Sequence, residues 1–307
     1  MADITASRIN NLQSSIALVL GTGSGQTGYG QTVTSVPVNN TGDIVEAADI
    51  NAIYADILKA RVHQAGAGDI GIAEVIQNLN IVAEDTSNFI SDAGVTTADP
   101  DGFKKGIEDF ESLMLTVIAN KAIIDATQAD LEPGITSVRS STWNGLIYHE
   151  IQVTFSSADA KRFFFNAGGE IRISANNTSA STPKGLDWNQ LCSQVGTIKF
   201  SAENTVSTSG GGSSIGNYDL TGAFQNIYQK IGSGTYSAIY AGNIYTVKAR
   251  SDIDTRIIFR IEFNDIVFDN NVDNNVDGRL ESVIQHYRAN GEVVTLAPSY
   301  FNSNELA

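Results

Sequence analysis

The sequence predicts an α+β protein in which an N-terminal helical domain precedes a C-terminal antiparallel β-sandwich. The first part of the chain repeats apolar residues every three or four positions, which is typical of amphipathic helices. From about residue 135 onward, apolar and polar residues alternate, which is typical of strands that bury one face. Pro133-Gly134 marks the change, and 307 residues are enough for two domains. We therefore expect domains at residues 1–134 and 135–307.

The first predicted helix follows Thr5, whose side chain can cap it, and ends at Gly21, which can take the left-handed conformation. A second helix is predicted over residues 46–63. The glycine-rich residues 21–42 between them, interrupted by Pro37, are expected to form a long loop that can include a short strand. The apolar positions of the two helices fall three or four residues apart on one face: Ile9, Leu12, Ile16, Val19, Ile50, Ile53, Ile57 and Ala60.

The rest of the N-terminal domain is predicted to contain two further helices. Residues 70–82 are apolar at mixed spacing and can form a third helix, whereas residues 85–100 are polar and rich in turn formers. Asp101 can cap a longer helix that runs to about Asp130, before the proline and glycine at the domain boundary. The apolar face of this helix is predicted to comprise Ile107, Phe110, Met114, Val117 and Ile124.

Short strands separated by turn residues are predicted throughout the C-terminal domain, which favours a sandwich over a parallel α/β sheet. The clearest element is a β-hairpin over residues 158–175, in which three phenylalanines form one strand and alternation from Ile171 onward forms the other. Asn166-Ala167-Gly168-Gly169 supplies its turn. The glycine-rich residues 207–216 are expected to be a flexible surface loop. Further strands are predicted at residues 147–155, 197–201, 245–250, 257–263, 280–287 and 292–296.

Composition limits the possible partners. Charged residues make up 17% of the chain, below the roughly 25% of typical soluble domains. Such a surface suits a protein that packs against copies of itself or other subunits, although an ordinary neutral β protein would have a similar composition. The net charge is −15: residues 1–134 carry 6 basic and 18 acidic side chains, and residues 135–307 carry 13 and 16. Because an acidic surface repels phosphate, neither nucleic-acid binding nor adsorption to anionic membranes is expected.

The single cysteine, Cys192, excludes an intrachain disulfide and a CxxC metal or redox site. The N-terminus lacks the basic residues of a secretory signal, and no apolar run reaches the roughly 18 residues of a membrane span. We therefore expect no membrane insertion, and synthesis in the cytoplasm as a soluble protein until assembly.

Two glycine motifs match functional patterns in residue type but not in context. Gly23–Gly28 fits GxGxxG, but a helical pattern precedes it and no helix is predicted to follow, so no dinucleotide cofactor is expected. Residues 212–216 fit GxSxG around Ser214, but no apolar strand precedes the serine. A triad would also need a histidine, and structural roles are expected for the three available, which are His63, His149 and His286. We predict no catalytic and no cofactor-binding residues.

Residues 269–278 are the strongest candidate for a metal site. Asp273, Asn275 and Asp277 precede Gly278 with the spacing that opens a Ca²⁺-binding loop, in which alternate oxygens converge on one cation. The closing glutamate is missing, because Ile284 stands at its position. The segment also lies between predicted strands rather than helices. A tight Asn/Asp turn is therefore the preferred interpretation, and no metal ligand is predicted.

Carboxylate pairs and aromatic residues are the remaining candidates for glycan chemistry. Asp109 with Glu111, or Asp252 with Asp254, would serve a glycosidase only across a cleft, and the first two point to different faces of a helix. Solvated surface is the preferred interpretation of both pairs. Exposed aromatic residues can stack on sugars, but most are expected to fill the core of the β domain. The candidates are Trp143, Trp188, Tyr218, Tyr236, Tyr240 and Tyr300.

Several segments resemble virion structural proteins of contractile-tailed bacteriophages. The resemblance is clearest over about residues 140–300, in FFFNAGGEIR at 163–172, NYDLTGAFQNIYQ at 217–229 and VDGRLES at 276–282. A weaker similarity lies in LGTGSGQTGYGQ at 20–31 and AADINAIYADI at 47–57. The resemblance implies that FFFNAGGEIR opens a β-rich C-terminal domain.

The resemblance also implies a function, namely a non-catalytic structural component of a tailed-phage virion. It would be a fibre-like or connecting appendage of the tail, baseplate or neck, located in the virion after assembly in the host cytoplasm. Its partners would be further copies of itself, as a trimer if it is a fibre, and other virion proteins. Two alternatives remain open. One is a carbohydrate-binding receptor module that contacts host-surface glycans, and the other is an enzyme such as a depolymerase, for which the sequence shows no catalytic constellation.

Overall fold

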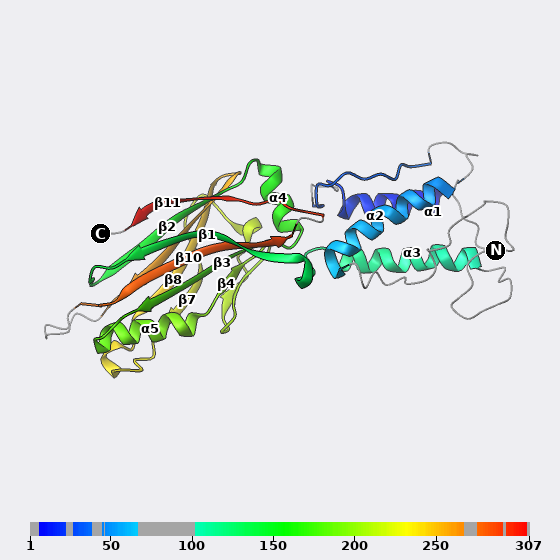
Figure 1. The fold of residues 1–307 in the computed structure, drawn as a ribbon. Coiled ribbons are helices and arrows are strands. Elements are labelled where there is room, and N and C mark those ends of the chain that lie inside the picture. Colours follow the sequence, from blue (N-terminus) through cyan, green and yellow to red (C-terminus); the bar gives the residue numbers. More distant parts are fainter. Residues whose placement is uncertain are drawn as a thin grey trace. The chain divides into compact units, whose positions relative to one another are not determined.

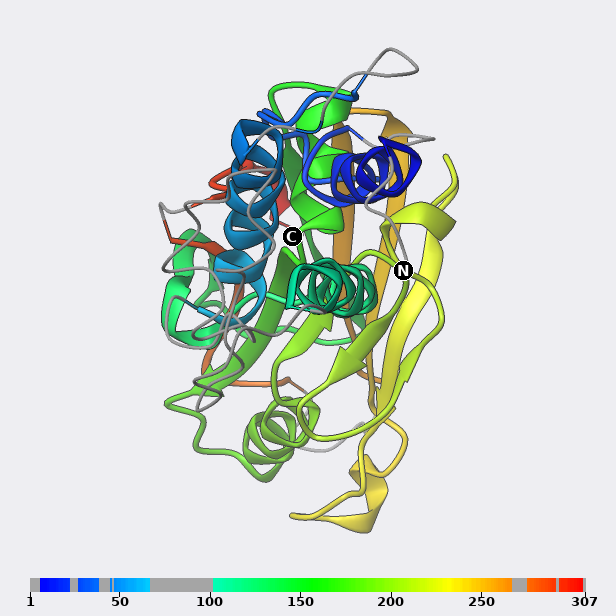
Figure 2. The same ribbon diagram turned by 90° about the vertical axis from the view of Figure 1, so that its right-hand side faces the viewer.

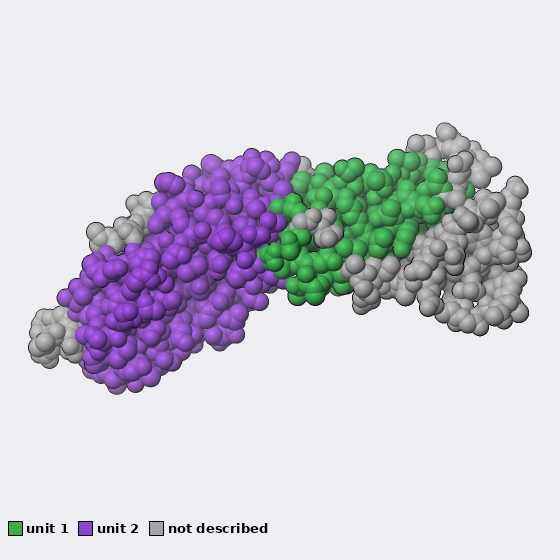
Figure 3. All heavy atoms as spheres, in the orientation of Figure 1, with its two compact units in different colours: residues 1–130, 162–168, 289–295 green, residues 131–161, 169–288, 296–307 purple. Residues whose placement is uncertain are grey.

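The computed structural model describes residues 6–22, 27–38, 45, 47–66, 102–266, 275–290 and 293–305. The chain divides into two compact units, which Figure 3 shows in different colours. The helical unit comprises residues 1–130, 162–168 and 289–295, and the sandwich unit comprises residues 131–161, 169–288 and 296–307. The predicted fold class, N-terminal helices followed by a C-terminal antiparallel sandwich, is confirmed.

Three helices pack together in the helical unit: α1 (Ala6–Val19), α2 (Ala47–Ala65) and α3 (Gly102–Ala119). Figure 2 views α1 and α3 nearly end-on, with α2 beside them. A bidentate ion pair joins α1 to α3, with Arg8 donating to the Glu111 carboxylate at 2.5 and 2.7 Å. The apolar faces predicted for the first two helices are buried, and α3 contributes its own: Ile9, Leu12, Ile16, Val19, Ile50, Ile53, Ile57, Ala60, Phe110, Leu113, Met114 and Val117.

Irregular chain between α1 and α2 is held in place by a buried carboxylate. Asp56 of α2 accepts hydrogen bonds from the main-chain N–H and the hydroxyl of both Thr34 and Ser35, at 2.7 to 3.0 Å. Within the described residues 27–38 the chain contains no strand. Gly21 follows α1 but is not left-handed; its role is spatial, because a Cβ there would lie 2.8 Å from the Ala17 carbonyl oxygen. Thr5 and the segments predicted at residues 70–82 and 85–100 lie outside the described residues.

The prediction of a helix from Asp101 to about Asp130 is wrong beyond α3. A turn follows Ala119, and Asp125 then caps the short 3₁₀ helix η2 (Ala126–Gln128) by accepting from the Thr127 N–H. Strand β1 (Ala129–Arg139) begins at once and runs through Pro133-Gly134. Proline is tolerated because β1 is the edge strand of its sheet. The dipeptide therefore lies inside a strand and does not end a helix.

Two antiparallel sheets form the sandwich unit (Figure 1). One has the strand order β1-β10-β3-β4-β5-β6 and the other the order β11-β2-β9-β8-β7. The strands are β2 (Leu146–Thr154), β3 (Glu170–Thr178), β4 (Ile198–Phe200), β5 (Thr205–Ser207), β6 (Gly212–Ser213), β7 (Gln225–Ile231), β8 (Ile244–Ile253), β9 (Arg256–Asn264), β10 (Arg279–Ala289) and β11 (Ser299–Glu305), besides β1.

The alternation of apolar and polar residues predicted five strands whose ends differ from the observed ends by a few residues at most: β2, β4, β8, β9 and β10. Large side chains meet between the two sheets, as where Phe200 of β4 packs edge-on against Phe259 of β9 with ring centroids 5.2 Å apart. Helix α5 (Pro183–Val195), which was not predicted, packs on β3 and β7. Thr182 caps it and Pro183 occupies its first turn, so its start signal is present in the sequence.

The first strand of the predicted hairpin at residues 158–175 is wrong, because Ala158–Asn166 forms helix α4. Ser157 Oγ accepts from the Ala160 N–H at the start of α4. Phe164 and Phe165 are buried, so their packing outweighs the strand preference of phenylalanine. Gly168 provides the left-handed turn with φ 84°, and the second strand is confirmed as β3.

Two further predictions are corrected. Residues 207–216 are not a flexible loop, because β5 and β6 pair there as a short hairpin whose turn includes Gly210 and Gly211 at positive φ. No strand lies in the described part of residues 292–296; the last strand, β11, begins at Ser299. Gly210 and Gly211 give the turn between β5 and β6 its left-handed conformation. Composition alone does not distinguish such a turn from a mobile linker.

Candidate functional site

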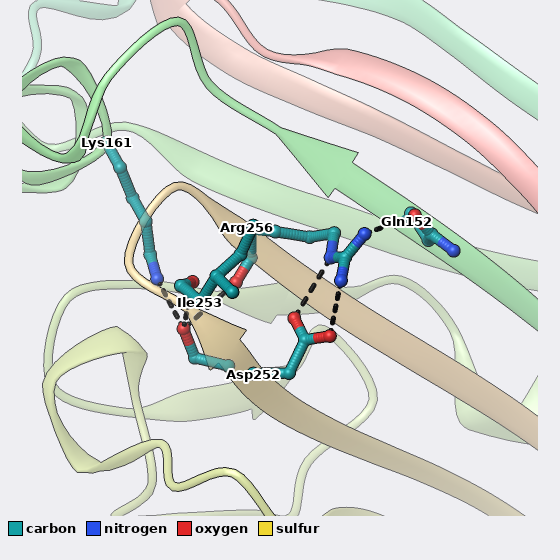
Figure 4. Close-up of polar contacts among 6 residues, drawn as sticks. Gln152, Lys161, Asp252, Ile253 and Arg256 are labelled. Atoms are coloured by element: carbon teal, nitrogen blue, oxygen red, sulfur yellow. Dashed lines mark hydrogen bonds and ion pairs between the residues drawn. The ribbon is translucent and has the colours of Figure 1, made fainter.

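Polar side chains gather at the turn between β8 and β9 (Figure 4). Lys161 of α4 donates a hydrogen bond to Ser251 Oγ at 2.8 Å. Arg256, at the start of β9, forms a bidentate ion pair with Asp252 and donates to Gln152 Oε1 of β2 at 3.1 Å. The cluster therefore connects β2, β8, β9 and the first turn of α4.

A lysine beside a serine hydroxyl is the arrangement of a Ser–Lys nucleophile. Burial lowers the pKa of Lys161 to about 8, against the opposing effect of the Asp254 and Asp252 charges. Ser251 Oγ, however, directs its proton at the main-chain carbonyls of Ile253 and Arg256, at 3.1 and 2.9 Å. The hydroxyl is thus committed to the turn, and the geometry favours a structural clasp over a nucleophile.

The predicted carboxylate pairs have separate surroundings. The hydrogen bond from Arg256 lowers the pKa of Asp252, whereas Asp254 is exposed. Glu111 is paired with Arg8, and the hydrogen bond from that guanidinium lowers its pKa. The side chain of Asp109 lies outside the described residues.

The structure describes only part of the first glycine motif and all of the second. In the first, residues 23–26 lie outside the described residues, and a Cβ at Gly28 would lie 1.9 Å from the Gly21 carbonyl oxygen, so this glycine permits close packing of main chain. In the second, Ser214 is exposed between β6 and the 3₁₀ helix η3 (Asn217–Asp219), without the strand-to-helix elbow that presents a nucleophile.

All three histidines are buried and hydrogen bonded inside the protein. Nε2 of His63 lies 2.8 Å from the Ala167 carbonyl oxygen. Nδ1 of His149 lies 2.7 Å from Ser282 Oγ, a serine–histidine contact that the sequence did not indicate. Ser282 has no exposed surface, so a substrate has no access to its hydroxyl. Burial lowers the pKa of all three imidazoles, to about 4 for His149.

Asp277 is occupied by protein donors. One of its oxygens accepts from the N–H and hydroxyl of Ser181 at 2.8 and 2.7 Å, and the other accepts from the Thr182 hydroxyl at 2.6 Å. Burial acts to raise its pKa, but these hydrogen bonds lower it overall. Asp273 lies outside the described residues, and Asn275 is exposed. Within the described part of the chain, no cluster of three or more His, Cys, Asp or Glu side chains is suited to a metal ion.

The aromatic candidates divide into a buried and an exposed group. Trp143, Trp188 and Tyr240 are buried, and Tyr300 is half-buried with its hydroxyl 2.8 Å from His286 Nδ1. Tyr218 is 50% exposed and Tyr236 is 51% exposed. A further aromatic residue, Phe224, contacts two guanidinium groups, with Arg250 at 4.7 Å and Arg260 at 4.2 Å from its ring centroid.

Comparisons with known proteins do not place the chain in a family. No protein-family model matches it. Neither curated proteins nor solved structures gave a significant match. None of the described helices is long and apolar enough to cross a membrane.

Proposed function

We propose that the protein is a non-catalytic structural component of a tailed-phage virion, in a fibre-like or connecting appendage of the tail, baseplate or neck. The observation that carries the proposal is the sequence resemblance, whose segments are parts of defined elements. FFFNAGGEIR spans the end of α4 and the start of β3, NYDLTGAFQNIYQ supplies η3 and most of β7, and VDGRLES leads into β10.

The roles of the polar candidates support a structural protein. Asp277 fixes the start of α5, Ser251 and Lys161 secure the β8–β9 turn, and Asp56 holds a loop. In each case the polar atoms satisfy main-chain or hydroxyl groups that would otherwise be left unpaired on burial. Side chains used in this way stabilise the fold and are not available to a substrate.

The edges of the five-stranded sheet support assembly with further subunits. Its outer strands are β11 and β7, and each carries a large exposed apolar side chain, Phe301 at 63% and Ile231 at 57%. Strand edges that carry exposed apolar side chains promote pairing with another chain. β11 is the better candidate, because β7 also contacts β5, β6 and α5. Homo-oligomerisation, as a trimer if the protein is a fibre, and contact with other virion proteins would cover these strands.

Localisation in a reconstruction of the intact particle tests the proposal. We expect the chain at a fixed station on the tail, baseplate or neck, in a copy number that matches the local symmetry. Native mass spectrometry of the purified protein should show an oligomer. A stable monomer that binds no particle protein would count against the proposal.

Carbohydrate binding by the same particle is the second candidate, and the exposure of Tyr218 and Tyr236 favours it. Aromatic faces at the surface can stack on sugar rings. A glycan array tests this candidate: specific binding that is lost in Tyr218→Ala or Tyr236→Ala supports it. Tyr240→Phe is the control, because Tyr240 is buried.

A further inference from the structure

A lysine and an aspartate form a fully buried ion pair in the sandwich unit. Lys184 lies in the first turn of α5, and Asp265 directly follows β9. Lys184 Nζ lies 2.6 Å from Asp265 Oδ2, and neither side chain has any exposed surface. Two charges removed from water in this way often cost more free energy than their mutual attraction returns. A reaction that removes both charges therefore also removes this free-energy cost of burial.

Asn243 and aromatic rings complete the site. With its amide oriented so that both ends are satisfied, Asn243 donates to Asp265 Oδ1 at 3.1 Å and accepts from Trp188 Nε1 at 3.2 Å. Trp188 packs against Trp143 and Phe263, with ring centroids 5.1 and 5.9 Å away. One carboxylate oxygen thus faces an amine and the other faces an amide donor.

The fold fixes both partners independently of their mutual contact. Thr182 caps α5 and is itself held by Asp277, so the helix turn that carries Lys184 is anchored. The Asp265 N–H donates to the Gly145 carbonyl oxygen at 2.9 Å, which anchors the other partner. Two reactive groups held in contact by a rigid framework react with a greatly raised effective concentration.

We propose that Lys184 and Asp265 condense to form an intramolecular amide bond. A proton passes from Nζ to Oδ2, which gives a neutral amine and a carboxylic acid. The Nζ lone pair then attacks Cγ, while the Asn243 amide stabilises the negative charge that develops on Oδ1. The bond from Cγ to Oδ2 breaks, and Oδ2 leaves as water with a second proton from Nζ. One ammonium and one carboxylate yield one amide and one water, so no further reactant is needed.

The cross-link has a mechanical consequence for the sandwich unit. It would close a covalent loop that contains α5 and strands β4 to β9. A bond across such a loop restricts the unfolded chain and so raises the melting temperature. This inference does not depend on the proposed function.

Mass spectrometry of the denatured protein tests the bond directly. We expect a mass lower than the sequence mass by one water, and a branched peptide that joins the segments of Lys184 and Asp265. Trypsin should fail to cleave after Lys184, because an acylated lysine is not a substrate. The full sequence mass, a loss of ammonia, or a loss of water mapped to another position would overturn the proposal.

Two lysine variants provide a matched comparison. The Lys184→Met variant should have the full mass of its sequence, without loss of water, and a lower melting temperature. Lys248 forms a similar ion pair with Glu262 at 2.8 Å, but its side chain is 34% exposed to water, and Lys248→Met should still lack one water. Retention of the water loss in Lys184→Met would refute the bond. If that variant does not fold, the mass and peptide map of the natural protein decide the question alone.

Discussion

Two buried imidazoles and the half-buried Asp277 carboxylate in the sandwich unit have specific internal partners. His149 contacts Ser282, His286 contacts Tyr300, and Asp277 accepts from Ser181 and Thr182. Such contacts satisfy polar atoms that have been removed from water, so loss of one partner leaves the other uncompensated. Single substitutions at these positions should therefore affect stability more than surface substitutions do.

Removal of the Asp277 charge should destabilise the sandwich unit. In Asp277→Asn, an NH₂ group replaces one acceptor oxygen and faces the donors of Ser181 or Thr182. We expect the free energy of unfolding to fall by about 1.5–3 kcal/mol, the usual range for hydrogen bonds to a charged group. Urea denaturation measures the change. Asp254→Asn, at an exposed position, is the control and should change stability by less than about 0.5 kcal/mol; equal effects would contradict the role assigned to Asp277.

The buried histidines should make stability depend on pH. Burial, together with the Arg139 and Arg288 charges, lowers the pKa of His149 and His286 from 6.5 to about 4. Between pH 4 and pH 6.5 the unfolded chain binds more protons than the folded chain, so stability rises with pH across this window. We expect the urea midpoint to fall as the pH is lowered through the window.

The same titration in His149→Gln should give a shallower slope, because one of the buried imidazoles no longer titrates. The control is the range below pH 4, where carboxylates with lowered pKa values, such as Asp277, give the slope in both proteins. A midpoint that does not change between pH 4 and pH 6.5 would show that the imidazoles are solvated in the folded protein.

At the scale of single elements, close main-chain contacts decide where strands and helices can pack. β1 passes β10 at Gly134, where a Cβ would lie 2.0 Å from the Ile284 carbonyl oxygen. A carbonyl oxygen of a paired strand cannot move without disturbing the ladder. Glycine is therefore required at position 134 because the Ile284 carbonyl leaves no space for a side chain, and not because of its own main-chain conformation.

Gly134→Ala should separate β1 from β10 locally. We expect a loss of roughly 1–3 kcal/mol in the free energy of unfolding, as for other overpacked sites. Hydrogen exchange should also increase at β1 amides. Gly222→Ala is the matched control, because a Cβ at Gly222 meets nothing within 4 Å and its φ is not positive. If both variants are equally stable, the β1–β10 contact is not as close as described.

Sequence periodicity predicts elements well where one face is buried and one is wet, as in β2 and β9. It fails at α4, because local strand preference does not reveal that Phe164 and Phe165 pack as neighbours on a helix. Periodicity also does not predict the contacts of the candidate sites. Asp277 is 96 residues from Ser181, and Lys184 pairs with Asp265 only once α5 has packed. Long-range contacts of this kind have no short sequence signature.

At the scale of the whole molecule, assembly should depend on the two outer strands of the five-stranded sheet. Phe301→Lys or Ile231→Lys places a charge on an edge strand, which opposes pairing with another chain. We expect multi-angle light scattering to show a smaller oligomer at unchanged circular dichroism. Leu146→Lys is the control, because Leu146 is 53% exposed on the inner strand β2. Oligomers that are unaffected by both edge variants would place the interface elsewhere.

The chain passes repeatedly from one unit to the other, because each unit is assembled from three stretches of sequence. A recombinant fragment beginning at residue 135 would lack the first half of β1, and it would carry residues 162–168 and 289–295 without the rest of the helical unit. Neither half can therefore be excised by a single cut. A protease nick between residues 288 and 296 would likewise leave β11 attached to the sandwich by non-covalent contacts alone, among them its pairing with β2 and the contact of Tyr300 with His286 of β10.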